Sequence, residues 1–243
     1  MINKPVGITS YDVIRDLKKK YPGEKIGHAG TLDPLAEGLL ICLVGREACK
    51  RQSEFMGKDK VYEFKFFLGV RTDTYDVLGL PSKWGPLGFQ VVSHLALDSV
   101  LSQFKGVISQ KIPPFSAVKI RGKPLYRWYL SGQIDQVEIP TNEIEVYKIE
   151  QLNREILSKH DLQNRVNSIL ETVKSGFRNE IVREAWDKFF QDTKQQEFVV
   201  LKLRAHVSKG TYIRAIVDKI GEDLGTYATC LNIKRTKIGS ALL

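Results

Sequence analysis

The spacing of apolar residues along the chain predicts a mixed order of strands and helices. Residues 60–68 alternate so that Tyr62, Phe64 and Phe66 share one face, which is the period of a strand. Residues 39–44 form a continuous apolar run suited to a buried strand. Other segments look extended at 137–149 and 198–207, or helical at 10–20, 46–56, 95–105 and 210–224 and, as a short helix, after Pro124. The pattern therefore indicates an α/β protein.

Residues 150–196 differ from the rest of the chain in charge and in pattern. They hold eight basic and eight acidic residues, so the net charge of +9 lies entirely outside them. Their apolar residues recur at helical spacing in two runs, at 166–177 and 181–190, and the spacing breaks near Gly176. This pattern predicts two helices inserted as a hairpin between two strands.

Length and composition favour a folded cytoplasmic protein with an anionic partner. The 243 residues are 42% hydrophobic and 27% charged, close to the average of globular domains. The longest apolar run, residues 39–44, is far shorter than the roughly 20 residues of a membrane helix. Residues 1–10 lack the features of a secretory signal, and three cysteines without a C-x-x-C pair fit reduced thiols. A pI of about 9.3 favours a polyanion such as nucleic acid.

The segment at 27–38 is the strongest candidate for chemistry. Its three glycines and one proline shape a loop between two strand candidates. Pro34 keeps Asp33 out of helical geometry, which leaves the Asp33 carboxylate for catalysis or for a local Asx-turn. We interpret the acidic segment 72–76 as a turn, because its two carboxylates lack a third metal ligand nearby. Without a zinc-type histidine spacing or a nucleotide-binding glycine motif, an enzyme with no metal and no cofactor is favoured.

Five motifs follow one another over some two hundred residues, at 3–10, 27–38, 60–76, 113–119 and 208–214. Together they closely resemble those of the bacterial TruB-type tRNA pseudouridine-55 synthases. The resemblance implies a pseudouridine-synthase fold, in which a mixed, mostly antiparallel sheet is flanked by helices. It also implies that the chain isomerises uridine 55 in the T loop of tRNA to pseudouridine.

The resemblance implies a role for several single residues. Asp33 is expected to be the nucleophile, Tyr62 to stack on the target base and Arg214 to pair with Asp33. The residues alone leave alternatives open, namely a core tyrosine at 62 and a phosphate contact at Arg214. An enzyme that flips a base out of folded RNA leaves a space, and His28 resembles the family histidine that fills it.

Contacts with the RNA backbone are expected from the basic residues Lys4, Lys60, Lys119, Arg121 and Lys209. The alternative for each is a solvated basic surface. The expected partner is the T-arm stem-loop of tRNA, with neither a membrane nor an obligate protein partner.

We expect one catalytic domain over residues 1–243, with the helical insertion at about 150–197 and without the C-terminal PUA domain that the family often carries. The insertion is open to a role in RNA contact, in partner binding or as a structural prop. Its neutral charge leads us to expect that it covers an apolar surface. Two other functions stay open: a non-catalytic tRNA-binding or tRNA-folding chaperone that uses the same cleft, and a glycoside hydrolase built on Asp33 and Glu37.

Overall fold

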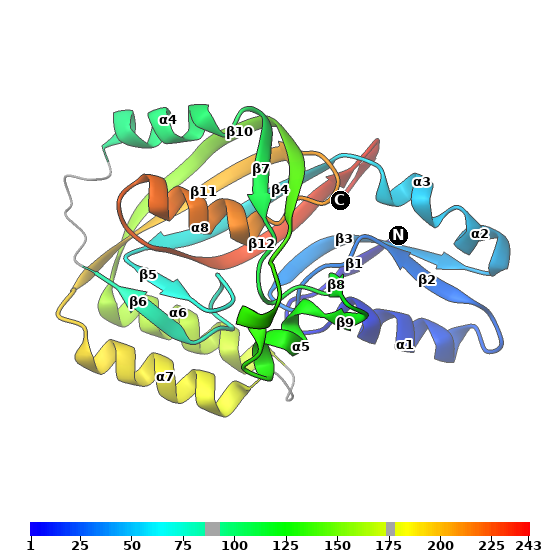
Figure 1. The fold of residues 1–243 in the computed structure, drawn as a ribbon, viewed down its shortest axis with the longest axis horizontal. Helices are drawn as coiled ribbons and strands as arrows, with labels where there is room; N and C mark the ends of the chain where they lie inside the picture. Colours follow the sequence, from blue (N-terminus) through cyan, green and yellow to red (C-terminus); the bar gives the residue numbers. More distant parts are fainter. Residues whose placement is uncertain (86–92, 174–177) are drawn as a thin grey trace.

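One long, curved sheet organises the chain (Figure 1). The computed structural model describes residues 1–85, 93–173 and 178–243. Neighbours in the sheet are, in order, β1 (Ile2–Lys4), β3 (Ala36–Val44), β12 (Ala228–Ile238), β4 (Lys60–Leu68), β11 (Glu197–Val207), β10 (Thr141–Ser158) and β7 (Gly106–Lys111). Two further strands join it: β2 (Ile26–Ala29) pairs with β3, and β13 (Ala241–Leu242) pairs with β12. Within the described ranges β3 and β12 run parallel and the other strand pairs are antiparallel, which confirms the expected fold class.

The sequence pattern predicted one of the two central strands of the sheet and missed the other. Strand β4 has the predicted bounds, and Tyr62, Phe64 and Phe66 point to a buried face. No strand was predicted after residue 224, but residues 228–238 form β12, which pairs with β3 on one side and β4 on the other. Gly38 (φ +105°) allows the parallel pairing, because a Cβ atom there would lie 2.3 Å from the carbonyl oxygen of Arg235.

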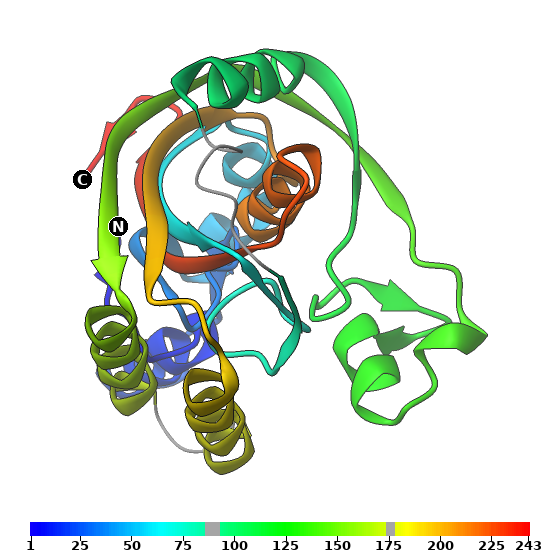
Figure 2. The ribbon, with the colours of Figure 1, turned by 90° about the vertical axis from the view of Figure 1, so that its left-hand side faces the viewer.

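The helices agree with the prediction in position and differ at their ends. Helix α1 (Ser10–Lys20) begins at Thr9, which forms a capping box with Asp12. The helix expected at 46–56 is two short ones, α2 (Arg46–Lys50) and α3 (Gln52–Met56), with Arg51 between them. Three other predicted helices are α4 (His94–Gln103), α5 (Leu125–Leu130) and α8 (Ile213–Asp223). The sheet curves around α8, which packs against β4 and β12 (Figure 2).

The insertion is a helical hairpin carried on extended strands. Strand β10 was expected to end at residue 149 but continues to Ser158, paired with β11 along the way. Helices α6 (Lys159–Thr172) and α7 (Asn179–Asp192) follow, and the break expected near Gly176 lies outside the described residues. Leu170 and Trp186 belong to the same hydrophobic core as the sheet. The expected cover of an apolar surface is therefore confirmed.

Residues 112–140 form an arm beside the sheet (green, right side of Figure 2). The arm contains the ribbon of β8 (Lys119–Ile120) and β9 (Lys123–Pro124), helix α5 and a 3-10 turn at Ile134–Gln136. Its own small hydrophobic cluster is built on Ile112, Leu125 and Val137. A second ribbon, β5 (Val70–Thr72) with β6 (Pro81–Trp84), lies between the sheet and α7 (Figure 1).

Candidate active site

Asp33 lies in the loop between β2 and β3, and its carboxylate faces Arg214. The loop is fixed on both sides, since the Pro34 carbonyl accepts a hydrogen bond from Gly7 N at 2.9 Å and Ser10 Oγ bonds both backbone groups of Leu32. The backbone carbonyl of Asp33 closes a turn with Ala36 N, while its carboxylate Oδ2 accepts from Arg214 Nε at 2.8 Å. With 34% of its side chain exposed, Asp33 is paired and still reachable from solvent.

Arg214 is the buried cation of the site. It stands in the first turn of α8 with 3% of its side chain exposed, and each of its three nitrogens donates a hydrogen bond. Nε bonds Asp33, Nη1 bonds the Thr74 carbonyl at 2.6 Å and Nη2 bonds the Phe115 carbonyl at 3.1 Å. Burial alone lowers the pKa of Arg214, but the charges of Asp33 and Asp76 outweigh burial and raise it. Burial of the side chain and the three hydrogen bonds inside the protein argue against the alternative role of Arg214 as a phosphate contact.

Asp76 is a third member of the cluster that the sequence analysis missed. Its Oδ2 lies 3.6 Å from Arg214 Nε, and its Oδ1 accepts from Thr74 Oγ1 and from Leu78 N. Burial raises the pKa of Asp76 to about 6, although Arg214 opposes the shift. The predicted turn at 72–76 is present, but the same carboxylate also faces the catalytic candidate. A signal for Asp76 was present in the sequence, because residues 72–76 belong to one of the five motifs that carry the family resemblance.

Tyr62 is 7% exposed in the apolar row of β4 and packs in the main hydrophobic core, and its stacking on a base stays a prediction. His28 is half-buried on β2 rather than in the loop proper, and its Nδ1 is buried without a hydrogen-bond partner. Burial, with Arg235 as the second cause, lowers the pKa of His28, which favours a neutral ring.

The basic candidates divide into two groups. Lys119, Arg121 and Lys209 are exposed, the first two on the β8–β9 ribbon and its turn, so their side chains are free to reach a phosphate. Lys4 and Lys60 are buried, which corrects the expectation that they face the RNA.

Buried cations instead bind backbone carbonyls, some of them beside the loop of Asp33. Lys4 Nζ donates to the carbonyls of Pro5 and Ile8, and Lys60 Nζ donates to those of Met56 and Lys58. Burial lowers the pKa of each lysine to about 8. Arg235 is 1% exposed and donates to the carbonyls of Leu39 and Gly30, which flank the loop of Asp33. These side chains are used for structure because a buried carbonyl needs a donor.

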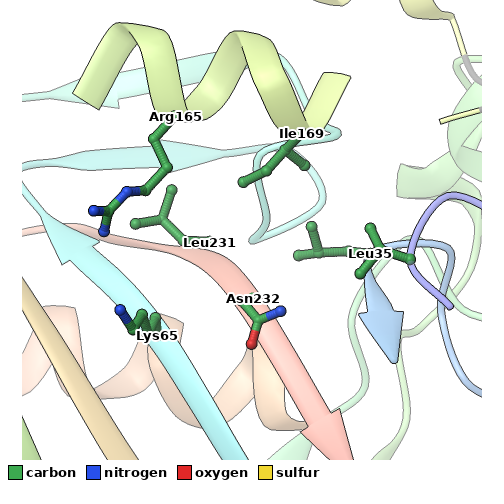
Figure 3. Close-up of a pocket in the computed structure, with 7 residues that line it drawn as sticks. Leu35, Lys65, Arg165, Ile169, Leu231 and Asn232 are labelled. Atoms are coloured by element: carbon green, nitrogen blue, oxygen red, sulfur yellow. The ribbon is translucent and has the colours of Figure 1, made fainter. Parts of the chain in front are cut away.

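A hollow of about 270 Å³ lies beside Leu35, in the loop of Asp33 (Figure 3). It is lined by Val6, Leu35, Lys65, Arg165, Ile169, Leu231 and Asn232. Lys65 has the opposite parity to Tyr62 in β4, so the hollow opens on the other face of the sheet. Glu155 pairs with Lys65 and Arg165 there, at 3.5 and 2.9 Å, which offsets the charge of the two cations. The hollow is therefore separate from the Asp33 cluster.

Nothing in the described part of the chain gathers into a metal site. No group of three or more His, Cys, Asp or Glu side chains lies together there. Cys42, Cys49 and Cys230 are free thiols, as expected. Among the described helices none is long and apolar enough to span a membrane.

Comparisons with known proteins find one family that matches most of the chain. Residues 18–170 match the family described as TruB family pseudouridylate synthase (N terminal domain). The chain is 38% identical to the tRNA pseudouridine synthase B of Fusobacterium nucleatum, over 98% of this chain and 67% of that protein. It is 34% identical to the protein of the same name from Desulfotalea psychrophila, over 98% of this chain and 80% of that one.

Solved structures show the same fold. The chain aligns with one in the crystal structure of a Cbf5-Nop10-Gar1 complex at a TM-score of 0.58 and 23% identity, and with one in an H/ACA RNP bound to a substrate RNA containing 2'-deoxyuridine at a TM-score of 0.54 and 21% identity. Each alignment covers 98% of this chain, which spans about half of the solved chains, 47% and 46% respectively.

Proposed function

Because the chain belongs to the TruB family of pseudouridylate synthases, we propose that it isomerises uridine 55 in the T loop of tRNA to pseudouridine. The observation that carries the proposal is the carboxylate of Asp33, partly exposed and held by the buried Arg214 at 2.8 Å. The proposal keeps the cytoplasmic location expected from the sequence.

The reaction needs few groups from the protein. The carboxylate of Asp33 bonds C1′ as the N1–C1′ bond breaks with its electron pair on the uracil. The uracil then turns, and C5 bonds C1′ and displaces the carboxylate, which leaves with the electron pair of the ester bond. C5 releases its proton, and N1 takes one up. Atoms and electrons balance without a cofactor, so the demands on the site are orientation and the exclusion of water. Arg214 meets the first demand, because three hydrogen bonds fix the guanidinium that holds Asp33.

Base flipping requires contacts from aromatic rings and from basic side chains. Tyr62 stacks on the flipped uracil, and His28 occupies part of the space that the base leaves. The neutral ring favoured for His28 suits stacking in an RNA helix. Lys119, Arg121 and Lys209 contact phosphates of the T arm, which their exposure supports.

One experiment tests the reaction and the nucleophile together. The protein is incubated with an unmodified T-arm stem-loop, and pseudouridine is mapped at nucleotide resolution. We expect modification at position 55 by the wild type, and none by Asp33→Asn, with binding of the RNA retained within about tenfold because the amide keeps the size of the side chain. Asp16→Asn is the matched control, since Asp16 is an exposed carboxylate on α1.

Three results would contradict parts of the proposal. Turnover by Asp33→Asn above a few per cent of the wild-type value would remove Asp33 as the nucleophile. Tight binding by the wild type without any conversion would favour a tRNA-binding chaperone instead. Conversion at a different uridine would keep the chemistry and overturn the position.

A further inference from the structure

The helical insertion touches the loop that surrounds Arg214 at two points. Arg178, at the start of α7, donates to Asp73 Oδ2 at 2.9 Å, and the side chain of Asp73 is 5% exposed. Further along α7, Trp186 Nε1 donates to the carbonyl of Val77 at 3.0 Å. Thr74 and Asp76, which contact Arg214, lie between these two anchored residues. The insertion therefore holds both ends of this short loop.

Arg178 also reaches the second carbonyl that binds Arg214. Its guanidinium lies over the ring of Phe115, 4.6 Å from the centroid, and the Phe115 carbonyl accepts from Arg214 Nη2. Arg178 thus contacts both segments that bind Arg214. Thr74 in the first segment accepts from Arg214 Nη1, and Phe115 in the second accepts from Arg214 Nη2. A cation is attracted to the face of an aromatic ring, and the ion pair with the buried carboxylate of Asp73 fixes the position of the Arg178 guanidinium.

The other partner of the ion pair is supported by the same hairpin. The carbonyl oxygen of Thr172, the last residue of α6, lies so close to Gly7 that a Cβ atom there would be 2.1 Å away. Gly7 has a φ of +91° and donates to the carbonyl of Pro34, next to Asp33. Only glycine fits this position without strain. The tip of the insertion thus lies against the loops of both Asp33 and Arg214.

We propose that the insertion is part of the active-site scaffold and that Arg178 is a positioning residue for Arg214. Without Arg178 the buried Asp73 carboxylate keeps the hydrogen bond from Leu80 N at 2.8 Å but loses its cation, so the 73–77 segment moves and with it the carbonyl of Thr74. A small displacement of a catalytic group is enough to slow a reaction strongly. The inference rests on the proposed synthase activity.

The experiment separates chemistry from binding. Single-turnover rates with saturating enzyme and dissociation constants for the T-arm stem-loop are measured for Arg178→Ala, Arg178→Lys, Asp73→Asn and the double variant of Arg178→Ala with Asp73→Asn. Arg183→Ala is the control, because Arg183 is also on α7 but bonds the Leu170 carbonyl within the hairpin. Wild-type activity and its loss in Asp33→Asn, measured in the same assay, establish the reaction independently.

We expect Arg178→Ala to lower the single-turnover rate by about 10- to 100-fold with the dissociation constant changed less than about threefold. Arg178→Lys returns a charge to Asp73 and recovers most of the rate, while the double variant is no slower than the slower single one. A rate unchanged in Arg178→Ala, or lowered equally in Arg183→Ala, would overturn the proposal. Weaker binding at an unchanged rate would make Arg178 an RNA contact instead. If Arg178→Ala fails to fold, the rates of Arg178→Lys and Asp73→Asn decide.

Discussion

Replacing Arg214 with methionine should destabilise the protein in a way that depends on pH. The substitution keeps an unbranched apolar side chain and removes the cation from a site that is 3% exposed. The carbonyls of Thr74 and Phe115 lose their donor, and Asp76 is left as a buried carboxylate. Asp33 contributes little to the cost, because it is a third exposed and water can replace the arginine. Breaking a buried ion pair from one side costs about 3–5 kcal/mol of unfolding free energy.

The sign of the pH dependence follows from Asp76. Its pKa in the folded protein, about 6, is above the ordinary value of 3.8, so between these values the native state binds more protons than the unfolded state. Asp76 therefore costs stability as pH rises through this window, by at most about 1.4 kcal/mol for each pH unit. Without Arg214 the pKa of Asp76 rises further and the window extends toward neutral pH. The penalty of Arg214→Met should thus be larger at pH 8 than at pH 5.5.

Urea unfolding of the wild type, Arg214→Met, Asp76→Asn and their combination, followed by tryptophan fluorescence at both pH values, measures these differences. Adding Asp76→Asn to Arg214→Met removes the unpaired charge, so we expect it to recover about 1–3 kcal/mol at pH 8 and to remove the extra pH dependence. Activity should stay lost in the combined variant. A penalty that is equal at both pH values, or a combined variant as unstable as Arg214→Met, would refute the view that Asp76 and Arg214 are a coupled buried pair.

Two further predictions concern the arm and the insertion. Replacing Lys119 and Arg121 with alanine should weaken T-arm binding and reduce the slope of log affinity against log salt by about two units, with little change in the rate at saturation; an unchanged slope would remove these residues from the interface. Trp186→Phe should cost about 1–3 kcal/mol in unfolding free energy, because the buried Val77 carbonyl loses its donor. A Trp186→Phe variant as stable as the wild type in urea would show that this bond contributes little.

Local periodicity predicted the elements whose signal is complete within a few residues. The alternation of β4 and the capping box at Thr9 each specify an element without help from distant parts of the chain. Strand β12 was missed because its basic residues interrupt the apolar pattern that identifies a buried strand. Arg235 is buried in that strand only because the carbonyls of Leu39 and Gly30, about 200 positions earlier, accept its hydrogen bonds. No local pattern carries this information.

The site shows the same limit at the level of single side chains. The pairing of Asp33 with Arg214, 181 positions apart, was expected from family resemblance and not from spacing. Asp76 was assigned to a turn because a turn explains it locally, and burial beside Arg214 gives it a second role. Lys4 was predicted to contact an RNA phosphate because its charge is evident from the sequence. The two backbone carbonyls that accept hydrogen bonds from its ammonium group are evident only from the structure.

The length of the β10–β11 hairpin decides what the insertion can reach. Its neutral charge correctly indicated packing against an apolar surface, but no local pattern indicated that strand β10 continues from residue 149 to Ser158. Nine further residues at roughly 3.3 Å each carry the helices about 30 Å along the sheet. That extension sets α7 beside the 73–77 segment and the end of α6 beside Gly7. A hairpin shortened in its strands, with both helices intact, should therefore keep its apolar face and lose its contacts with the loops of Asp33 and Arg214.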